Sequence, residues 1–201
     1  LSSAEVCGAI TDNPIREDSY GPLDPTALRA CYAEGKRAGE AMCTAWSHQT
    51  GTQTRILRLF HTYGPGMPLG DGRVFSDFVH NALNNQAITI QSDGLATRSY
   101  CYVTDAVIGI LIALFKGESA QPYNLGNADG ELSVGELAEL ISALSHQKGV
   151  IYRQQPTHTG YLRSSLQRSR PDVSRIHALG WQATTSPTEG FQRTLRSFQK
   201  D

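Results

Sequence analysis

The chain has 201 residues, 39% of them hydrophobic and 18% charged, which is ordinary for one sizeable globular domain. Its net charge of −1 provides no basic field that would attract nucleic acid or a membrane surface. No apolar run approaches the roughly 18–20 residues that span a bilayer. The four cysteines have no C-x-x-C spacing and indicate free thiols in a reducing compartment, so we expect a cytoplasmic protein.

The first sixty residues predict a strand, a long loop, a helix and a second strand. Residues 1–6 are typical of a strand tail before a connection rich in Gly and Pro. Residues 29–49 contain no proline and several alanines, which favours a helix ended by Gly51. The run TRILRLF at 54–60 alternates little, as in a parallel strand covered on both faces.

The middle of the chain predicts shorter elements. Residues 61–72 are rich in Gly and Pro and form a loop, and apolar residues at nearly helical spacing follow over 74–83. We expect short extended segments at 87–91 and 98–103. Residues 105–116 (DAVIGILIALFK) are so apolar that we expect a largely buried helix.

The last third alternates strands and helices again. A strand is expected at 122–125, and Ser133 with Glu136 forms a capping box that begins a helix. A strand at 150–152 and helices at 172–179 and 187–198 complete the pattern. This order indicates an α/β layer fold with a mainly parallel sheet, to which the short strands after residue 60 add a smaller lobe.

Tyr32 and Lys36 stand four residues apart on the first predicted helix and therefore project from one face. An ammonium beside a tyrosine favours the phenolate and lowers the tyrosine pKa, so the pair can act as an acid or base toward a sugar hydroxyl. Ser3 could share the same proton. The alternative is a solvated surface pair, because this spacing also arises by chance.

Six stretches, taken in order, resemble the extended short-chain dehydrogenases that act on nucleotide sugars. Within that superfamily, the similarity is greatest to the UDP-glucuronic acid decarboxylases. The stretches are LSSAEV (1–6), CYAEGKR (31–37), HTYGP (61–65), DGRV (71–74), TRSYCYV (97–103) and YNLGN (123–127).

The resemblance implies the C-terminal part of a Rossmann-like doubly wound parallel sheet, plus a smaller α/β substrate-binding lobe. Residues 1–60 would be the remaining part of the NAD-binding domain, and residues 61–201 mainly the nucleotide-sugar lobe, with some segments returning to the Rossmann domain. The family's G-x-x-G-x-x-G turn, which holds the NAD pyrophosphate, does not occur in the sequence. We therefore expect the N-terminal dinucleotide-binding half to be absent.

The resemblance also implies catalytic roles. Tyr32 would be the acid/base, and Lys36 would activate it and bind the nicotinamide ribose of NAD. Ser3 would hydrogen-bond the sugar hydroxyl that is oxidised. Glu5 occupies the position of the active-site glutamate, and its alternative is a carboxylate at the mouth of a loop.

Substrate-binding roles follow in the same way. Arg98 would grip the nucleotide diphosphate, for which a forked guanidinium is suited. His61 stands where an asparagine of the family contacts the sugar phosphate. The other implied positions are Arg73 near the diphosphate, Thr89 and Gln91 beside the nucleobase, and Arg168 or Arg170 before the final Pro-Asp. For Arg73 and Arg168 the alternative is ordinary solvated charge.

The implied chemistry is oxidation of the sugar to a transient 4-ketone. Decarboxylation of UDP-glucuronate ranks first, and 4-epimerisation or 4-reduction second. A 4,6-dehydratase ranks third, because Ala4 occupies the position of its acid. The implied assembly is a homodimer. The non-enzymatic alternative is an inactive fragment or a degenerate homologue that binds a nucleotide sugar.

Overall fold

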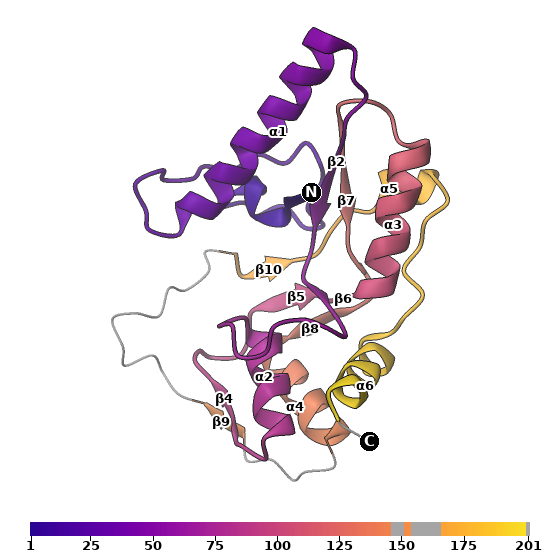
Figure 1. The fold of residues 1–201 in the computed structure, drawn as a ribbon. Helices are drawn as coiled ribbons and strands as arrows, with labels where there is room; N and C mark the ends of the chain where they lie inside the picture. The colour runs from indigo at the N-terminus through magenta and orange to yellow at the C-terminus, as the bar shows by residue number, and fades with distance from the viewer. Residues whose placement is uncertain (146–150, 154–165, 200–201) are drawn as a thin grey trace.

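The structure is a computed structural model that describes residues 1–145, 151–153 and 166–199 (Figure 1). Its first part is a sheet of three parallel strands in the order β1-β2-β7. These strands are β1 (Ser2–Ser3), β2 (Arg55–Leu59) and β7 (Gln121–Leu125). The strand predicted at 54–60 is thus the centre of the sheet. Because β7 pairs with β2, the chain returns to this sheet between two groups of lobe elements.

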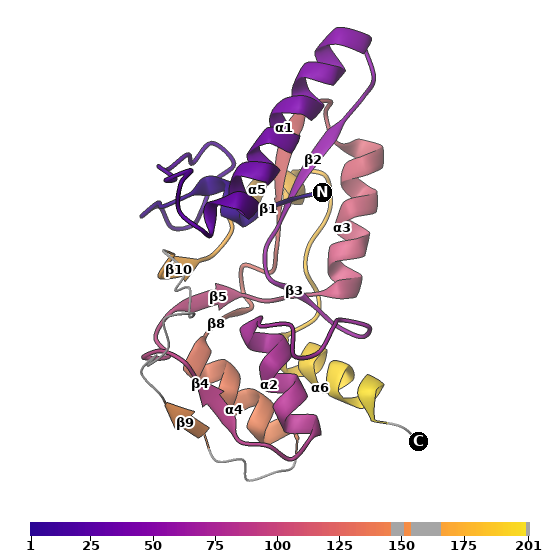
Figure 2. The ribbon, with the colours of Figure 1, turned by 60° about the vertical axis from the view of Figure 1, so that its left-hand side comes forward.

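Two long helices lie on opposite sides of the sheet, as Figures 1 and 2 show. Helix α1 (Ala30–Thr50) packs against β1 and β2, and it ends at Gly51 in a left-handed conformation with φ 73°. Helix α3 (Val103–Lys116) packs against β2 and β7, and the short α5 (Ser174–Ala178) also contacts β7. The predicted helix at 29–49 is confirmed within one residue.

The expectation that the helix at 105–116 is largely buried is wrong. The buried residues of helix α3 are Asp105, Ala106, Gly109 and Ala113, and Ala106 and Ala113 share a core cluster with Leu57 and Leu125 of the sheet. A side chain at Gly109 would collide with Leu125, because an added Cβ would lie 2.3 Å from the Leu125 Cδ1. The helix therefore presents its small residues to β7. Its larger apolar side chains, Val107, Ile108, Leu111, Leu114 and Phe115, face outward and are 47–78% exposed.

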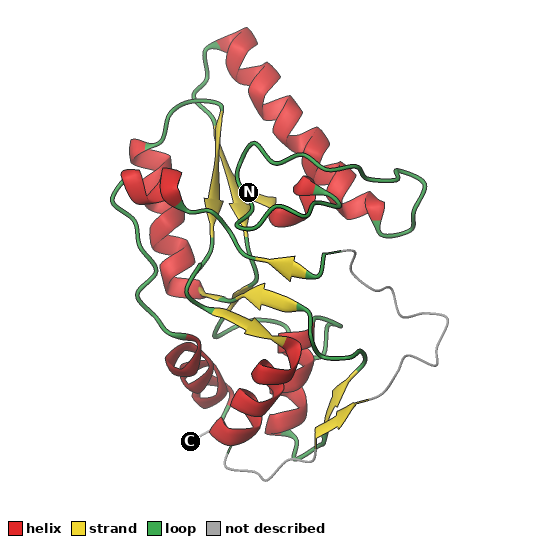
Figure 3. Ribbon diagram, turned by 180° about the vertical axis from the view of Figure 1, so that it is seen from behind, coloured by secondary structure: helices red, strands yellow, loops and turns green. Residues whose placement is uncertain are grey.

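The second part of the molecule is a lobe in which short strands pack with helices (Figure 3). Its sheet has the order β10-β5-β8, with β10 parallel and β8 antiparallel to the central β5. Two further parallel pairs, β3-β6 and β4-β9, complete the strands. The strands are β3 (Thr62–Tyr63), β4 (Ile88–Ile90), β5 (Thr97–Ser99), β6 (Cys101–Tyr102), β8 (Glu131–Ser133), β9 (Ile151–Arg153) and β10 (Arg168–Ser169).

The three lobe helices are α2 (Val74–Leu83), α4 (Val134–Leu144) and α6 (Pro187–Phe198), each close to its predicted bounds. The capping box at the start of α4 is present, since Ser133 and Glu136 exchange both hydrogen bonds. The lobe core is aromatic: the ring of Phe191 stacks on Tyr63 at 3.9 Å and meets Tyr100 edge-on. Within the described ranges, no helix has the length and apolar content to cross a membrane.

Candidate active site

Ser3 and Glu5 lie where the first strand ends. A single 3-10 turn, η1 (Ala4–Cys7), follows β1, and Ser3 caps it by accepting a hydrogen bond from the Glu5 amide at 3.3 Å. Ser3 is buried and Glu5 is partly exposed. Because β1 is parallel to its neighbour, both residues stand at the carboxyl end of the sheet, the edge at which α/β proteins bind ligands.

Tyr32 and Lys36 share one face of α1, as their spacing predicts. The Lys36 Nζ lies 5.8 Å from the centre of the Tyr32 ring and donates a hydrogen bond to the Leu1 carbonyl at 3.1 Å. Tyr32 is 53% exposed, so a ligand can reach it. The Lys36 bond ties the helix to the strand that carries Ser3, and the structure thus places the predicted acid/base pair beside that strand.

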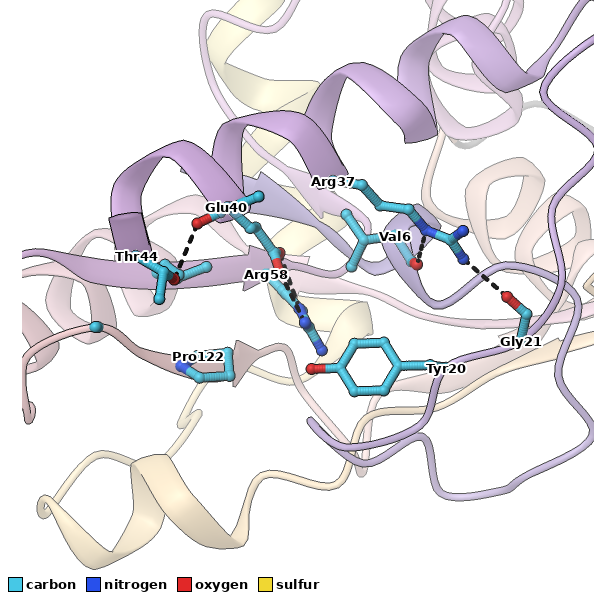
Figure 4. A pocket seen from close by; sticks show the side chains of 11 residues that line it. Val6, Tyr20, Gly21, Arg37, Glu40, Thr44, Arg58 and Pro122 are labelled. Carbon is cyan, nitrogen blue, oxygen red and sulfur yellow. Dashed lines mark hydrogen bonds and ion pairs between the residues drawn. The ribbon is translucent and has the colours of Figure 1, made fainter. Parts of the chain in front are cut away.

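A cavity of about 410 Å³ lies farther along α1, between that helix, the start of β7 and the loop that carries Tyr20 (Figure 4). Its charged side chains form hydrogen bonds with other residues of the chain. Arg37 donates to the carbonyls of Val6 and Gly21, at 2.7 and 2.9 Å. None of the predicted catalytic residues lines this cavity. We assign it to the packing of α1 on the sheet.

The sequence analysis missed the buried ion pair in the wall of this cavity. The guanidinium of Arg58, 1% exposed, donates two hydrogen bonds to Glu40 at 2.7 and 2.9 Å and a third to the Glu17 carbonyl at 2.7 Å. Burial opposes its charge, yet the bonds with Glu40 and Tyr20 hold the pKa of Arg58 above its ordinary value. An arginine inside the apolar run TRILRLF was the available signal, because a buried charge needs a partner.

His61, Arg73 and Arg98 form a basic group near the end of β2. His61 follows β2, and its ring meets Tyr100 edge-on at 5.9 Å. Burial, then the positive charges of Arg98 and Arg73, lower the pKa of His61 to about 3, so the imidazole is neutral at physiological pH. Arg73 precedes α2 and pairs with Asp71 at 2.6 Å. Three predicted ligand-binding residues are therefore neighbours.

Arg98 and Arg168 stand on neighbouring strands and point away from one another. In the register of β10 with β5, Arg168 is opposite Thr97, and Ser169 is opposite Arg98. Side chains alternate between the faces of a strand, so the two arginines lie on opposite faces. Arg98 donates to the Leu166 carbonyl at 2.8 Å, whereas Arg168 forms two bonds with Glu131 at 2.6 and 2.8 Å. The structure does not bring Arg168 to the group around His61.

The remaining predicted positions lie in or near the strands of the lobe. Thr89 is the partly buried centre of β4, and the exposed Gln91 follows that strand directly. Arg170 donates to the Ala128 carbonyl at 3.0 Å. The role of Thr89 and Gln91 beside the nucleobase stays a prediction.

The sequence profile of the NAD dependent epimerase/dehydratase family matches residues 1–126. The chain belongs to this family. Two similar relatives are UDP-glucuronic acid decarboxylase 1 of Danio rerio and UDP-glucuronic acid decarboxylase 3 of Arabidopsis thaliana, at 37% and 38% identity. The matches cover 100% and 98% of this chain but 46% and 56% of those proteins. The chain thus spans about half the length of the relatives it matches.

Solved structures of the family share the fold. A UDP-glucose 4-epimerase from Thermotoga maritima, crystallised with UDP-glucose, superposes with a TM-score of 0.84 at 25% identity, covering 98% of this chain and 61% of that one. A dTDP-glucose 4,6-dehydratase from Bacillus anthracis in complex with NAD superposes with a TM-score of 0.80 at 23% identity, covering 98% and 60%. The Rossmann-like α/β architecture implied by the sequence is confirmed.

Proposed function

We propose that this chain supplies the acid/base and ligand-binding residues of an NAD-dependent enzyme that decarboxylates UDP-glucuronate. The observation that carries the proposal is the pair of Tyr32 and Lys36 on one face of α1, tied by Lys36 to the strand that ends at Ser3. The 37–38% identity to UDP-glucuronic acid decarboxylases supports the substrate.

In the proposed reaction Tyr32 takes the proton of the C4 hydroxyl of the sugar, and Ser3 hydrogen-bonds that hydroxyl. When bound, NAD supplies the oxidant that accepts the hydride from C4. The positive charge of Lys36 near the Tyr32 ring favours negative charge on the tyrosine oxygen during the transfer. The 4-ketone lies β to the C6 carboxylate, so the C5–C6 bond can break and release carbon dioxide, leaving its electron pair on C5.

The described residues fit the nicotinamide end of the cofactor. Lys36 donates one hydrogen bond to the Leu1 carbonyl, and an ammonium group carries further donors that can reach ribose hydroxyls. The half-exposed Tyr32 leaves room beside it. No G-x-x-G-x-x-G turn occurs in the sequence to hold the pyrophosphate. These residues would therefore hold the reactive end of NAD.

Two sets of residues support the proposed division into an NAD-binding part and a nucleotide-sugar lobe. Tyr32, Lys36 and Ser3 lie with the parallel sheet, whereas Arg73, Arg98 and Thr89 belong to elements of the lobe. A homodimer remains part of the proposal as an expectation from the family.

The second candidate is a 4-epimerase, favoured by the superposition with the Thermotoga maritima UDP-glucose 4-epimerase. An epimerase leaves Glu5 without a role, so we rank it below the decarboxylase. A 4,6-dehydratase ranks third, since the buried Ala4 offers no acid beside Glu5.

Incubation of the whole protein with NAD and UDP-glucuronate labelled at C6 distinguishes these reactions. We expect labelled carbon dioxide and a UDP-pentose. Release of UDP-galacturonate without carbon dioxide would support the epimerase instead. A 4-keto-6-deoxy sugar from UDP-glucose or dTDP-glucose, without decarboxylation, would contradict the ranking.

A further inference from the structure

Helix α1 is attached to the sheet mainly through polar side chains. Of its 21 residues, all within the described ranges, two are buried, Ala30 and Ala33. An alanine side chain is a single methyl group, so apolar packing gives this helix little preference for one rotation about its axis. The rotation of α1 therefore depends on its polar contacts, and the position of Tyr32 depends on that rotation.

Glu40 contacts both strands that lie beneath α1. Its carboxylate accepts a hydrogen bond from the Ser2 hydroxyl at 2.5 Å and two from the Arg58 guanidinium at 2.9 and 2.7 Å. Ser2 of β1 stands opposite Arg58 of β2 in the strand register, so the two side chains leave the sheet on one face. One carboxylate thus joins the helix to two neighbouring strands.

The partner of Glu40 is itself held in place. The Arg58 guanidinium donates a third hydrogen bond to the Glu17 carbonyl at 2.7 Å, and the Glu17 carboxylate accepts one from the Asn124 amide of β7 at 2.9 Å. A rotation of α1 that separated Glu40 from Arg58 would leave a guanidinium of 1% exposure without its counter-ion, which is strongly unfavourable. The pair therefore gives α1 a fixed angular reference on the sheet.

Glu40 also shares a side of α1 with the proposed acid/base pair. Tyr32, Lys36 and Glu40 follow one another at intervals of four residues, and residues so spaced are neighbours on a helix surface. Ser2 directly precedes Ser3 in β1. The contacts of Glu40 therefore connect the helix face that carries Tyr32 with the strand that carries Ser3.

From these contacts we infer that Glu40 is a positioning residue, which fixes the rotation of α1 and thereby the approach of Tyr32 to the sugar hydroxyl beside Ser3. The inference rests on the proposed function, because it assigns Glu40 to the acid/base step of that reaction. Glu40 lies two helical turns from Tyr32, about 12 Å along the axis, and takes no part in the proton transfer. Its effect is geometric, since a base must lie within hydrogen-bond reach and a misplacement of about 1 Å can lower a rate about a hundredfold.

Turnover of the whole protein separates positioning from stability. Glu40→Gln removes the carboxylate, and the control Ile141→Ala opens a cavity in the lobe core, so both substitutions should destabilise the fold. We expect Glu40→Gln to lower kcat roughly tenfold to hundredfold per folded molecule, counted by bound UDP, with KM for UDP-glucuronate unchanged. Ile141→Ala should keep a near-normal kcat per folded molecule.

Ser2→Ala is the milder variant, because it leaves the pair of Glu40 and Arg58 intact and removes the bond to β1 alone. We expect a smaller loss of kcat, again without a change in KM. Normal kcat in Ser2→Ala, together with normal kcat or loss of the fold in Glu40→Gln, would overturn the inference.

Fluorine NMR of protein labelled with fluorotyrosine reports the surroundings of Tyr32 without turnover. The signal that disappears in Tyr32→Phe belongs to Tyr32. We expect this signal to move in Glu40→Gln and Ser2→Ala and to stay in place in Ile141→Ala. If the signal moves in this way but the protein does not act on UDP-glucuronate, the proposed function fails and the positioning contact stands. A Tyr32 signal that is the same in all three variants would overturn the inference, whether or not UDP-glucuronate is the substrate.

Discussion

The parallel-sheet part and the lobe differ in how completely they cover their own apolar side chains. In the lobe, α2 and α4 bury Phe78, Val79, Leu137 and Ile141 at 2% exposure or less. In the sheet part, the large apolar side chains on the outer face of α3 remain exposed, as do Met42 and Trp46 in the second half of α1. Contiguous exposed apolar surface usually marks a site that another protein surface covers. The lobe closes its core by itself, whereas the sheet part leaves an apolar surface open.

The predicted acid/base residues and the basic group of His61, Arg73 and Arg98 lie mainly in different parts of the molecule. The acid/base residues Tyr32 and Lys36 lie on the open part, and two of the three residues in the basic group, Arg73 and Arg98, lie in elements of the closed lobe. This arrangement predicts that chemistry and nucleotide binding respond to different substitutions.

The largest expected effect is on turnover. Tyr32→Phe in the whole protein should lower kcat by roughly 100- to 10,000-fold, the usual contribution of a general acid or base. Affinity for UDP should be unchanged, because the nucleotide residues lie elsewhere. Cys31→Ala, at the exposed neighbouring position, is the control and should leave kcat as it is. A Tyr32→Phe enzyme with near-normal kcat would remove the acid/base role.

The next comparison concerns ion pairs. Glu40→Gln leaves the buried Arg58 uncompensated and should lower the free energy of unfolding by about 3–5 kcal/mol. Glu189→Gln in the lobe removes the exposed pair with Arg193 and should cost less than about 1 kcal/mol. Urea denaturation of both variants provides the measurement. Equal losses would show that the Arg58 pair is not buried as described.

Core substitutions test the difference in coverage directly. Ile141→Ala in α4 should lower the free energy of unfolding by about 2–5 kcal/mol, because it opens a cavity in a closed core. Leu111→Ala, on the exposed face of α3, should stay within about 0.5 kcal/mol. A loss for Leu111→Ala as large as that for Ile141→Ala would mean that the outer face of α3 is covered in solution.

The two arginines of neighbouring strands give a smaller, sharper contrast. Arg98→Ala should weaken UDP binding by roughly 1.5–3 kcal/mol, the range for hydrogen bonds to charged groups. Arg168→Ala should change it little, because Arg168 faces away and pairs with Glu131. Calorimetric titration with UDP compares them, and a larger loss for Arg168→Ala would reverse the assignment of faces.

Local signals explain which parts of the fold were predictable. The starts of α4 and α6 follow from a capping box and from a proline in the first turn, and α1 ends at a glycine that adopts a left-handed conformation. The spacing of Tyr32 and Lys36 fixes their common face once α1 is a helix. These features need no knowledge of distant residues.

Tertiary contacts determine the features of the fold and the site that the sequence could not predict. The composition of residues 103–116 shows that α3 is apolar, but the small residues that contact β7, including Gly109, decide which face is buried. The partner of Arg58 comes from α1, far from it in sequence. Strand β10 has two residues and no readable period, so the face of Arg168 depends on its register with β5.

The central claim is that these residues build a nucleotide-sugar site but only the reactive end of a cofactor site. Parallel calorimetric titrations of the 201-residue chain with UDP and with NAD test it most directly. We predict measurable binding of UDP, abolished in the double variant Arg73→Ala/Arg98→Ala, and negligible binding of NAD, since the sequence has no G-x-x-G-x-x-G turn. Micromolar binding of NAD, or no binding of UDP, would contradict the claim.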